Sequence, residues 1–100
     1  MKLRDAARVV RSKNAGPTVL TIDILASDEA SFRRIAESPA LLPDALARRL
    51  GLPSDACKLT RIDPALAVKV TLGRPIVAGS PGDLDVYGAQ QHRALLDIEL

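Results

Sequence analysis

The segment Thr18–Ala26 constrains the fold of this chain more than any other part of the sequence. Its residues, TVLTIDILA, alternate so that every second side chain from Leu20 to Ala26 is apolar, while Asp23 lies on the opposite side. This period of two predicts a strand over residues 18–26. Because one side of the strand is wholly apolar and the other is mixed, we expect a sheet that is covered on one face only.

Two helical pieces are predicted after this strand, between residues 28 and 50. Ser27 is placed to cap the first piece with its hydroxyl, and Pro39 ends that piece. Pro43 suits the first turn of the second piece, and Gly51 suits the left-handed residue after its last turn. The buried side of the second piece is expected to carry leucines spaced four apart: Leu42, Leu46 and Leu50.

An antiparallel hairpin is predicted from residue 57 to residue 72. Its strands, Cys57–Ile62 and Ala67–Leu72, alternate like the first strand, and Asp63-Pro64 is a turn pair that joins them. The side chains that alternate with the apolar ones are polar: Lys58, Thr60, Lys69 and Thr71. The hairpin therefore adds its polar residues to the uncovered face of the sheet.

The two ends of the chain receive one predicted element each. Apolar residues of segment 3–10 recur at helical spacing, which predicts a short helix or turn there. Residues 94–100 alternate, which predicts the last strand. The ends also carry opposite charge, since residues 1–17 are basic and residues 76–100 are acidic. We expect the two ends to attract each other if the fold brings them together.

The order of these elements predicts an α+β fold, a ferredoxin-like sandwich that forms one domain over residues 1–100. The sheet has four mostly antiparallel strands, with helices on one face and a long loop before the last strand. In such a sheet Asp23 neighbours Lys69 and Asp97 on the face without helices. That face, which Thr21 and Glu99 extend, meets either water or a partner.

The composition excludes several classes of protein. The single cysteine cannot form an internal disulfide and, with one histidine, cannot build a zinc site, which suits a cytoplasmic protein. No segment has the roughly twenty apolar residues of a membrane helix, so we expect no membrane contact. Phe32 and Tyr87 are too few aromatic residues for bases to stack on, so we expect no nucleic acid partner. No cofactor motif occurs, and no cofactor is predicted.

The turn-forming segment 11–17 carries a candidate anion site. Arg11 and Lys13 supply positive charge, and Ser12 and Asn14 supply hydrogen-bonding groups just before a glycine. Such a turn can hold a carboxylate or a phosphate through side chains and backbone N–H groups. A solvated turn that closes onto the acidic end of the chain explains the same residues, and the sequence leaves both interpretations open.

The polar segment 79–92 carries the candidate catalytic residues. His92 could act as a general base, with Asp83 or Asp85 orienting it or acting alone. Four neighbours are candidates for ligand contacts: Ser80, Tyr87, Gln90 and Gln91. The spacing of the aspartates begins like a calcium loop but lacks the glutamate at its twelfth position, so no metal site is predicted. A glycine- and proline-rich loop whose side chains satisfy its own backbone is the other open interpretation.

Stretches along nearly the whole chain carry a resemblance to a known family. They are LRDAARVVRSKNAGP at residues 3–17, TIDIL at 21–25, DPALAVKV at 63–70, RPIVAGSPGDLDVYGAQQH at 74–92 and LLDIEL at 95–100. They resemble the bacterial family called domain of unknown function 4387. That family is itself similar to the small ferredoxin-like domain at the C-terminus of acyclic terpene utilisation (AtuA) proteins, and some members are encoded beside such a protein or fused to it.

The resemblance implies an accessory subunit or binding partner of an AtuA-like enzyme that breaks down branched or small carboxylic acids or their thioesters. The residues themselves leave two alternatives open. One is a module that binds a carboxylate or an acyl-CoA through segments 11–17 and 79–92. The other is a lyase or isomerase whose site lies at a subunit interface and uses His92. Self-association into a homo-oligomer also stays open.

Overall fold

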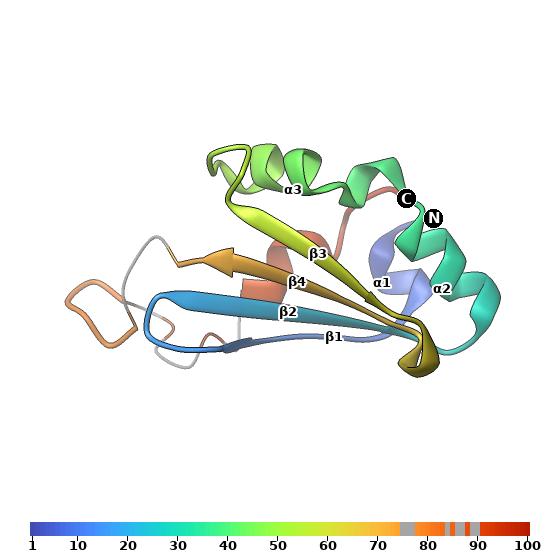
Figure 1. Cartoon of the computed structure of the whole chain (residues 1–100), viewed down its shortest axis with the longest axis horizontal. Coiled ribbons are helices and arrows are strands. Elements are labelled where there is room, and N and C mark those ends of the chain that lie inside the picture. Colours follow the sequence, from blue (N-terminus) through green and yellow to red (C-terminus); the bar gives the residue numbers. More distant parts are fainter. Residues whose placement is uncertain (75–77, 84, 86–87, 89–90) are drawn as a thin grey trace.

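The computed structural model of the chain is an α+β fold built on one four-stranded antiparallel sheet (Figure 1). The strands lie in the order β1-β2-β4-β3. This confirms the predicted α+β class, and the arrangement is ferredoxin-like. The structure describes residues 1–74, 78–83, 85, 88 and 91–100.

Three of the strands form where the sequence predicts them. They are β2 (Val19–Ala26), β3 (Cys57–Ile62) and β4 (Ala67–Gly73). β3 and β4 form the predicted antiparallel hairpin, and the short helix η2 (Asp63–Ala65) joins them. β2 pairs with β4 so that Asp23 lies opposite Lys69, as expected.

The remaining strand is β1 (Ala7–Asn14), so the helix predicted over residues 3–10 is wrong beyond its first turn. That turn is α1 (Leu3–Ala6), and the chain pairs with β2 from Ala7 onward. A helix of this length is marginal on its own, because forming its first turn fixes several residues for one hydrogen bond. The backbone hydrogen bonds with β2 therefore stabilise this segment as a strand, although its short apolar pattern fits a helix.

The strand predicted over residues 94–100 is also wrong. This segment begins in the short helix η3 (Gln91–Leu95) and continues as an irregular tail. Leu95 and Ile98 are its buried residues, three positions apart, whereas an alternating strand would bury Leu96 together with Ile98. The spacing of the buried residues fits a turn of helix and not a strand.

The fold brings the two oppositely charged ends of the chain together (Figure 1). Backbone hydrogen bonds join them, including one of 2.8 Å from the N–H of Leu3 to the carbonyl of Ile98. Ion pairs connect N-terminal cations with C-terminal carboxylates: the Met1 amino group with Glu99, and Lys2 and Arg4 with Asp97. The tail therefore closes the fold against the N-terminus without forming a strand of the sheet.

The helices cover one face of the sheet. They follow β2 in the predicted region as α2 (Glu29–Ala36), η1 (Pro39–Leu41) and α3 (Pro43–Leu50). Gly51 adopts the left-handed conformation with φ 71°, as predicted. The cap of α2 is Asp28 and not Ser27, because the Asp28 carboxylate accepts a hydrogen bond of 2.7 Å from the N–H of Ser31. No helix in the described ranges is long and apolar enough to cross a membrane.

Leu42 departs from the predicted stripe of leucines. It precedes α3 with extended backbone angles, φ −60° and ψ 145°, and is 52% exposed. Leu46 is fully buried and Leu50 is half-buried, as expected for the side of α3 that faces the sheet. The stripe therefore begins inside the helix and not at the residue before it.

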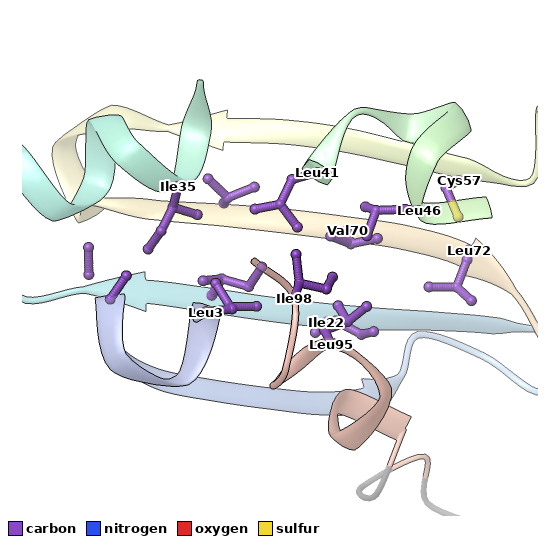
Figure 2. Packing of buried hydrophobic residues seen from close by; sticks show 14 of the residues in the cluster. Leu3, Ile22, Ile35, Leu41, Leu46, Cys57, Val70, Leu72, Leu95 and Ile98 are labelled. Carbon is purple, nitrogen blue, oxygen red and sulfur yellow. The ribbon is translucent and has the colours of Figure 1, made fainter. Parts of the chain in front are cut away.

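The core lies between the sheet and its helices and is mainly aliphatic (Figure 2). Ile22 and Val70 from the central strands belong to one buried cluster with Leu46 from α3 and with Leu95 and Ile98 from the tail. The helices and the tail together seal this face of the sheet. No helix among the described residues lies on the opposite face, which is therefore the part of the sheet left to meet water or a partner.

Candidate functional site

β1 divides the predicted anion segment between the two faces of the sheet. Arg11 and Lys13 are exposed on the face without helices. Ser12 and Asn14 alternate with them and therefore lie on the helix side, where Ser12 is only 7% exposed. The four residues therefore do not converge on one site. Arg11 and Lys13 lie on one face of the sheet, and Ser12 and Asn14 lie on the other.

Ser12 contacts His92 across the fold. The backbone N–H of His92 donates to Oγ of Ser12 at 3.1 Å, and Nδ1 of the imidazole lies 3.4 Å from the same oxygen. The hydroxyl thus satisfies a backbone donor in the first turn of η3, the role that a capping residue plays at a helix start. The two polar segments singled out in the sequence meet at this point.

Arg74, which no sequence pattern singles out, forms a second contact between β1 and the loop. Its side chain is 4% exposed and forms an ion pair with Asp83, 3% exposed, with 2.8 Å between Nη2 and Oδ1. Nη1 donates to Oδ1 of Asn14 at 2.7 Å, and Nη2 also donates to the carbonyl oxygen of Asp85 at 2.9 Å. One buried guanidinium therefore ties β1 to the loop that follows β4.

The carboxylate of Asp83 is surrounded by donors. The backbone N–H groups of Gly79 and Asp85 each donate to it at 2.9 Å. These hydrogen bonds, together with the charge of Arg74, hold the pKa of Asp83 below its ordinary range. Asp83 is therefore ionised at neutral pH. Its carboxylate binds Arg74 and two backbone N–H groups, which argues against its predicted role of orienting His92.

Three other candidate residues of segment 79–92 that the structure describes, Ser80, Asp85 and Gln91, make contacts within the segment. The carboxylate of Asp85 accepts a hydrogen bond of 3.1 Å from Nε2 of Gln91. The carbonyl of Ser80 accepts one of 3.1 Å from the N–H of Asp83. The predicted ligand contacts Tyr87 and Gln90 lie outside the described residues. These bonds favour the interpretation of a loop that satisfies its own backbone.

Gly88 brings the loop into close contact with β1. A Cβ atom at this position would lie 2.6 Å from both Oδ1 of Asn14 and a methyl carbon of Leu20, and the φ angle of Gly88 is +70°. Only glycine allows both this conformation and this approach. We call the contacts of Ser12, Asn14, Arg74, Asp83, Gly88 and His92 the loop anchor.

Within the described part of the chain, no group of three or more metal-ligating side chains could hold an ion.

The face of the sheet without helices, which we call the open face, is ordered in three rows. Cross-strand neighbours in an antiparallel sheet point to the same side, so each row crosses every strand. The apolar row is Val9, Leu25, Ala67 and Ile62; the middle row is Arg11, Asp23, Lys69 and Thr60; the outer row is Lys13, Thr21, Thr71 and Lys58. The open face therefore changes from apolar to basic along the strands.

The open face carries the polar residues that alternation predicts on β2, β3 and β4, whereas its apolar row and the residues of β1 on it are not predicted. Arg11, and not Asp97, is the second neighbour of Asp23. Glu99 lies beside the amino group of Met1 instead of joining the face. Both differences from the prediction follow from β1, and not the tail, being the strand next to β2.

The charges of the open face are unbalanced. It carries four cations, Arg11, Lys13, Lys58 and Lys69, against the carboxylate of Asp23. Nε of Arg11 lies 3.5 Å from Oδ2 of Asp23, whose side chain is 14% exposed, and Lys69 is the cross-strand neighbour on the other side. Pairing with basic neighbours thus accounts for a carboxylate in the centre of a strand, and the face keeps a positive charge.

A shallow groove of about 350 Å³ lies elsewhere, beside η1, α3 and the tail. Its walls are Ala40, Ala45, Arg49, Asp97, Ile98 and Glu99. It shares no lining residue with the open face or with the loop anchor, so it completes neither of them.

A protein-family match covers nearly the whole chain. The model of the family described as domain of unknown function DUF4387 matches residues 3–99. The chain belongs to the DUF4387 family. The matched part of this DUF4387 domain runs from α1 through η3 and so contains both the open face and the loop anchor. Neither a curated protein nor a solved structure matches the chain.

Proposed function

We propose that this DUF4387 domain is a non-catalytic accessory subunit that docks through its open face onto a larger enzyme. The observation that carries the proposal is the apolar row, which lies on the side of the sheet that none of the described helices covers. Ile62 is 38% exposed there, and Val9 and Leu25 are half-buried. Ala67, between Ile62 and Leu25, is only 8% exposed, so the row reaches the surface at Ile62 and in part at Val9 and Leu25. Apolar side chains that reach the surface beside polar ones favour an interaction surface.

The family resemblance suggests which enzyme is the partner. DUF4387 domains resemble the small C-terminal domain of AtuA proteins, and the resemblance associates the family with such proteins. We therefore propose an AtuA-like protein as the partner, and the breakdown of branched or small carboxylic acids or their thioesters as the process. A bacterial origin and a cytoplasmic location belong to the same proposal.

The loop anchor supports a structural role for the residues that looked most catalytic. Ser12 holds the start of η3, and Asp83 is committed to Arg74 and to backbone donors. A lyase or isomerase site at a subunit interface remains the alternative for His92. A His92→Ala variant that leaves the activity of the assembled enzyme unchanged removes that alternative.

A second candidate function is the binding of a small carboxylate or an acyl-CoA, which the cations of the open face favour. Arg11 and Lys13 lie on this face together with Lys58 and Lys69. Calorimetry with an acyl-CoA on the free chain tests it. Binding that is lost in an Arg11→Ala/Lys13→Ala variant supports this function, and equal affinity in the variant contradicts it.

Co-purification tests the proposed function directly. We expect a tagged copy of the chain, co-expressed with an untagged AtuA-like protein from the same genome, to elute with that protein as one complex in size-exclusion chromatography. The proposal is contradicted if the chain elutes alone, or only with copies of itself, while the AtuA-like protein is present in the same lysate.

A further inference from the structure

We infer that the open face recognises an acidic protein surface, with carboxylates opposite the outer row and apolar side chains opposite the apolar row. This inference rests on the proposed function and specifies the chemistry of the partner. It follows from three properties of the open face: the way its charge is distributed, the distance between its rows, and the kinds of residue that it lacks.

The middle row contains the one carboxylate of the three rows, Asp23, which offsets part of the positive charge of Arg11 and Lys69. Asp23 lies between Arg11 and Lys69 as the cross-strand neighbour of both, and the Arg11 guanidinium lies within ion-pair distance of its carboxylate. A carboxylate between two cations weakens their attraction for an approaching anion. The middle row therefore contributes less to the field of the face than its number of cations suggests.

The outer row contains cations and no carboxylate. Lys13 and Lys58 stand at its two ends, on the edge strands β1 and β3, and the hydroxyl residues Thr21 and Thr71 lie between them. Among the described residues, neither lysine has a carboxylate within ion-pair distance, and both are exposed. Carboxylates of a partner gain most at this row, where they meet two cations and no competing anion.

The spacing of the rows sets the pattern that a partner must present. The apolar row and the outer row are four residues apart along β1, or about 13 Å at the usual rise of an antiparallel strand. A fitting partner therefore carries an apolar strip and a line of aspartate or glutamate residues about 13 Å from it. Such an interface combines apolar contact for affinity with charge for orientation and rate of association.

Other occupants fit the open face less well. Two copies of this chain, placed face to face, would either oppose lysines to lysines and arginines or place the lysines of the outer row against apolar side chains, and neither arrangement gives these lysines a carboxylate partner. A single-stranded nucleic acid needs aromatic side chains for its bases, and the open face has none in any of its three rows. An apolar row beside a basic row therefore favours a different protein that presents carboxylates.

Titration of the free chain with a hexaglutamate peptide, followed by backbone amide chemical shifts, tests the inference without the partner. We expect the shifts to centre on Lys13, Thr21, Thr71 and Lys58. A Lys13→Glu/Lys58→Glu variant should lose them, while an Arg34→Glu/Arg48→Glu variant should keep them. The control changes the same amount of charge at exposed residues of α2 and α3, on the other side of the molecule.

Circular dichroism first establishes that the same variants are folded. Their rates of association with the AtuA-like protein are then measured. We expect the Lys13→Glu/Lys58→Glu variant to associate about tenfold or more slowly at low salt and the control at the rate of the unmodified chain. Equal rates for both variants, or peptide shifts that are absent or lie on α2 and α3, would overturn the inference. So would a free chain that dimerises through this face, or a uridine oligomer that binds it more tightly than hexaglutamate. Failed co-purification with the expected peptide shifts counts against the proposed function alone.

Discussion

A Leu95→Ala variant is expected to lose about 2–5 kcal/mol of the free energy of unfolding, the range for a buried leucine that leaves a cavity behind. The Leu95 side chain is fully buried and belongs to the core cluster beneath the sheet. A domain of this size has only about 5–15 kcal/mol in total, so the loss is large. Urea unfolding followed by circular dichroism measures it.

Leu96→Ala is the matched control, because it removes the same atoms from the adjacent residue. Leu96 is only half-buried, so we expect a loss below about 1 kcal/mol. If residues 94–100 formed the strand that their alternation predicts, Leu96 would point into the core and Leu95 away from it. A larger loss for Leu96→Ala than for Leu95→Ala would therefore contradict the helical turn η3.

An Arg74→Ala variant is expected to lower the melting temperature by about 10 °C or more, because it leaves Asp83 without its buried partner. The guanidinium is 4% exposed and donates to Asn14, to Asp83 and to the carbonyl of Asp85. Arg33→Ala is the control: its ion pair with Glu29 is exposed on α2, so we expect a decrease of no more than about 4 °C. Equal decreases for the two variants would show that the loop anchor adds little to stability.

The pH dependence of stability checks the same contact through Asp83. Folding lowers the pKa of this carboxylate, so the stability it contributes is present above about pH 4 and is lost as the pH falls further. An Asp83→Asn variant, which has no such carboxylate to protonate, should lose stability less steeply between pH 5 and pH 2. Parallel curves for the variant and the unmodified chain would contradict this role of Asp83.

The parts of the fold that the sequence predicts correctly are those with a strong local signal. The alternation of β2 and of the β3–β4 hairpin placed the polar residues on one face, and Gly51 ended α3 as expected. The patterns at the two ends of the chain are too short to predict their structure correctly. Segment 3–10 fits a helix until β2 supplies a strand partner, and segment 94–100 alternates although its buried residues are three apart.

The loop anchor shows why the candidate site was harder to predict. Ser12 and His92 are 80 residues apart, and Arg74 meets Asn14 from 60 residues away. The periodicity of neighbouring residues carries no information about such distant contacts. The sequence therefore marks the two polar segments as unusual but does not predict that they touch. The sequence does not single out Arg74, because arginine is usually exposed and only the fold shows that Asp83 pairs with it in a buried position. Alternation predicts which side chains of β2, β3 and β4 lie on the open face, but not that β1 completes it.

Lysine footprinting of the assembled complex tests most directly whether the open face is the docking surface. The lysines of the chain are Lys2, Lys13, Lys58 and Lys69, and all but Lys2 lie on the open face. Reductive methylation followed by mass spectrometry compares their reactivity in the free chain and in the complex with the AtuA-like protein. We predict that Lys13, Lys58 and Lys69 react more slowly in the complex, while Lys2 reacts at the same rate. Unchanged reactivity of these three lysines, or protection of Lys2 instead, would contradict docking through the open face.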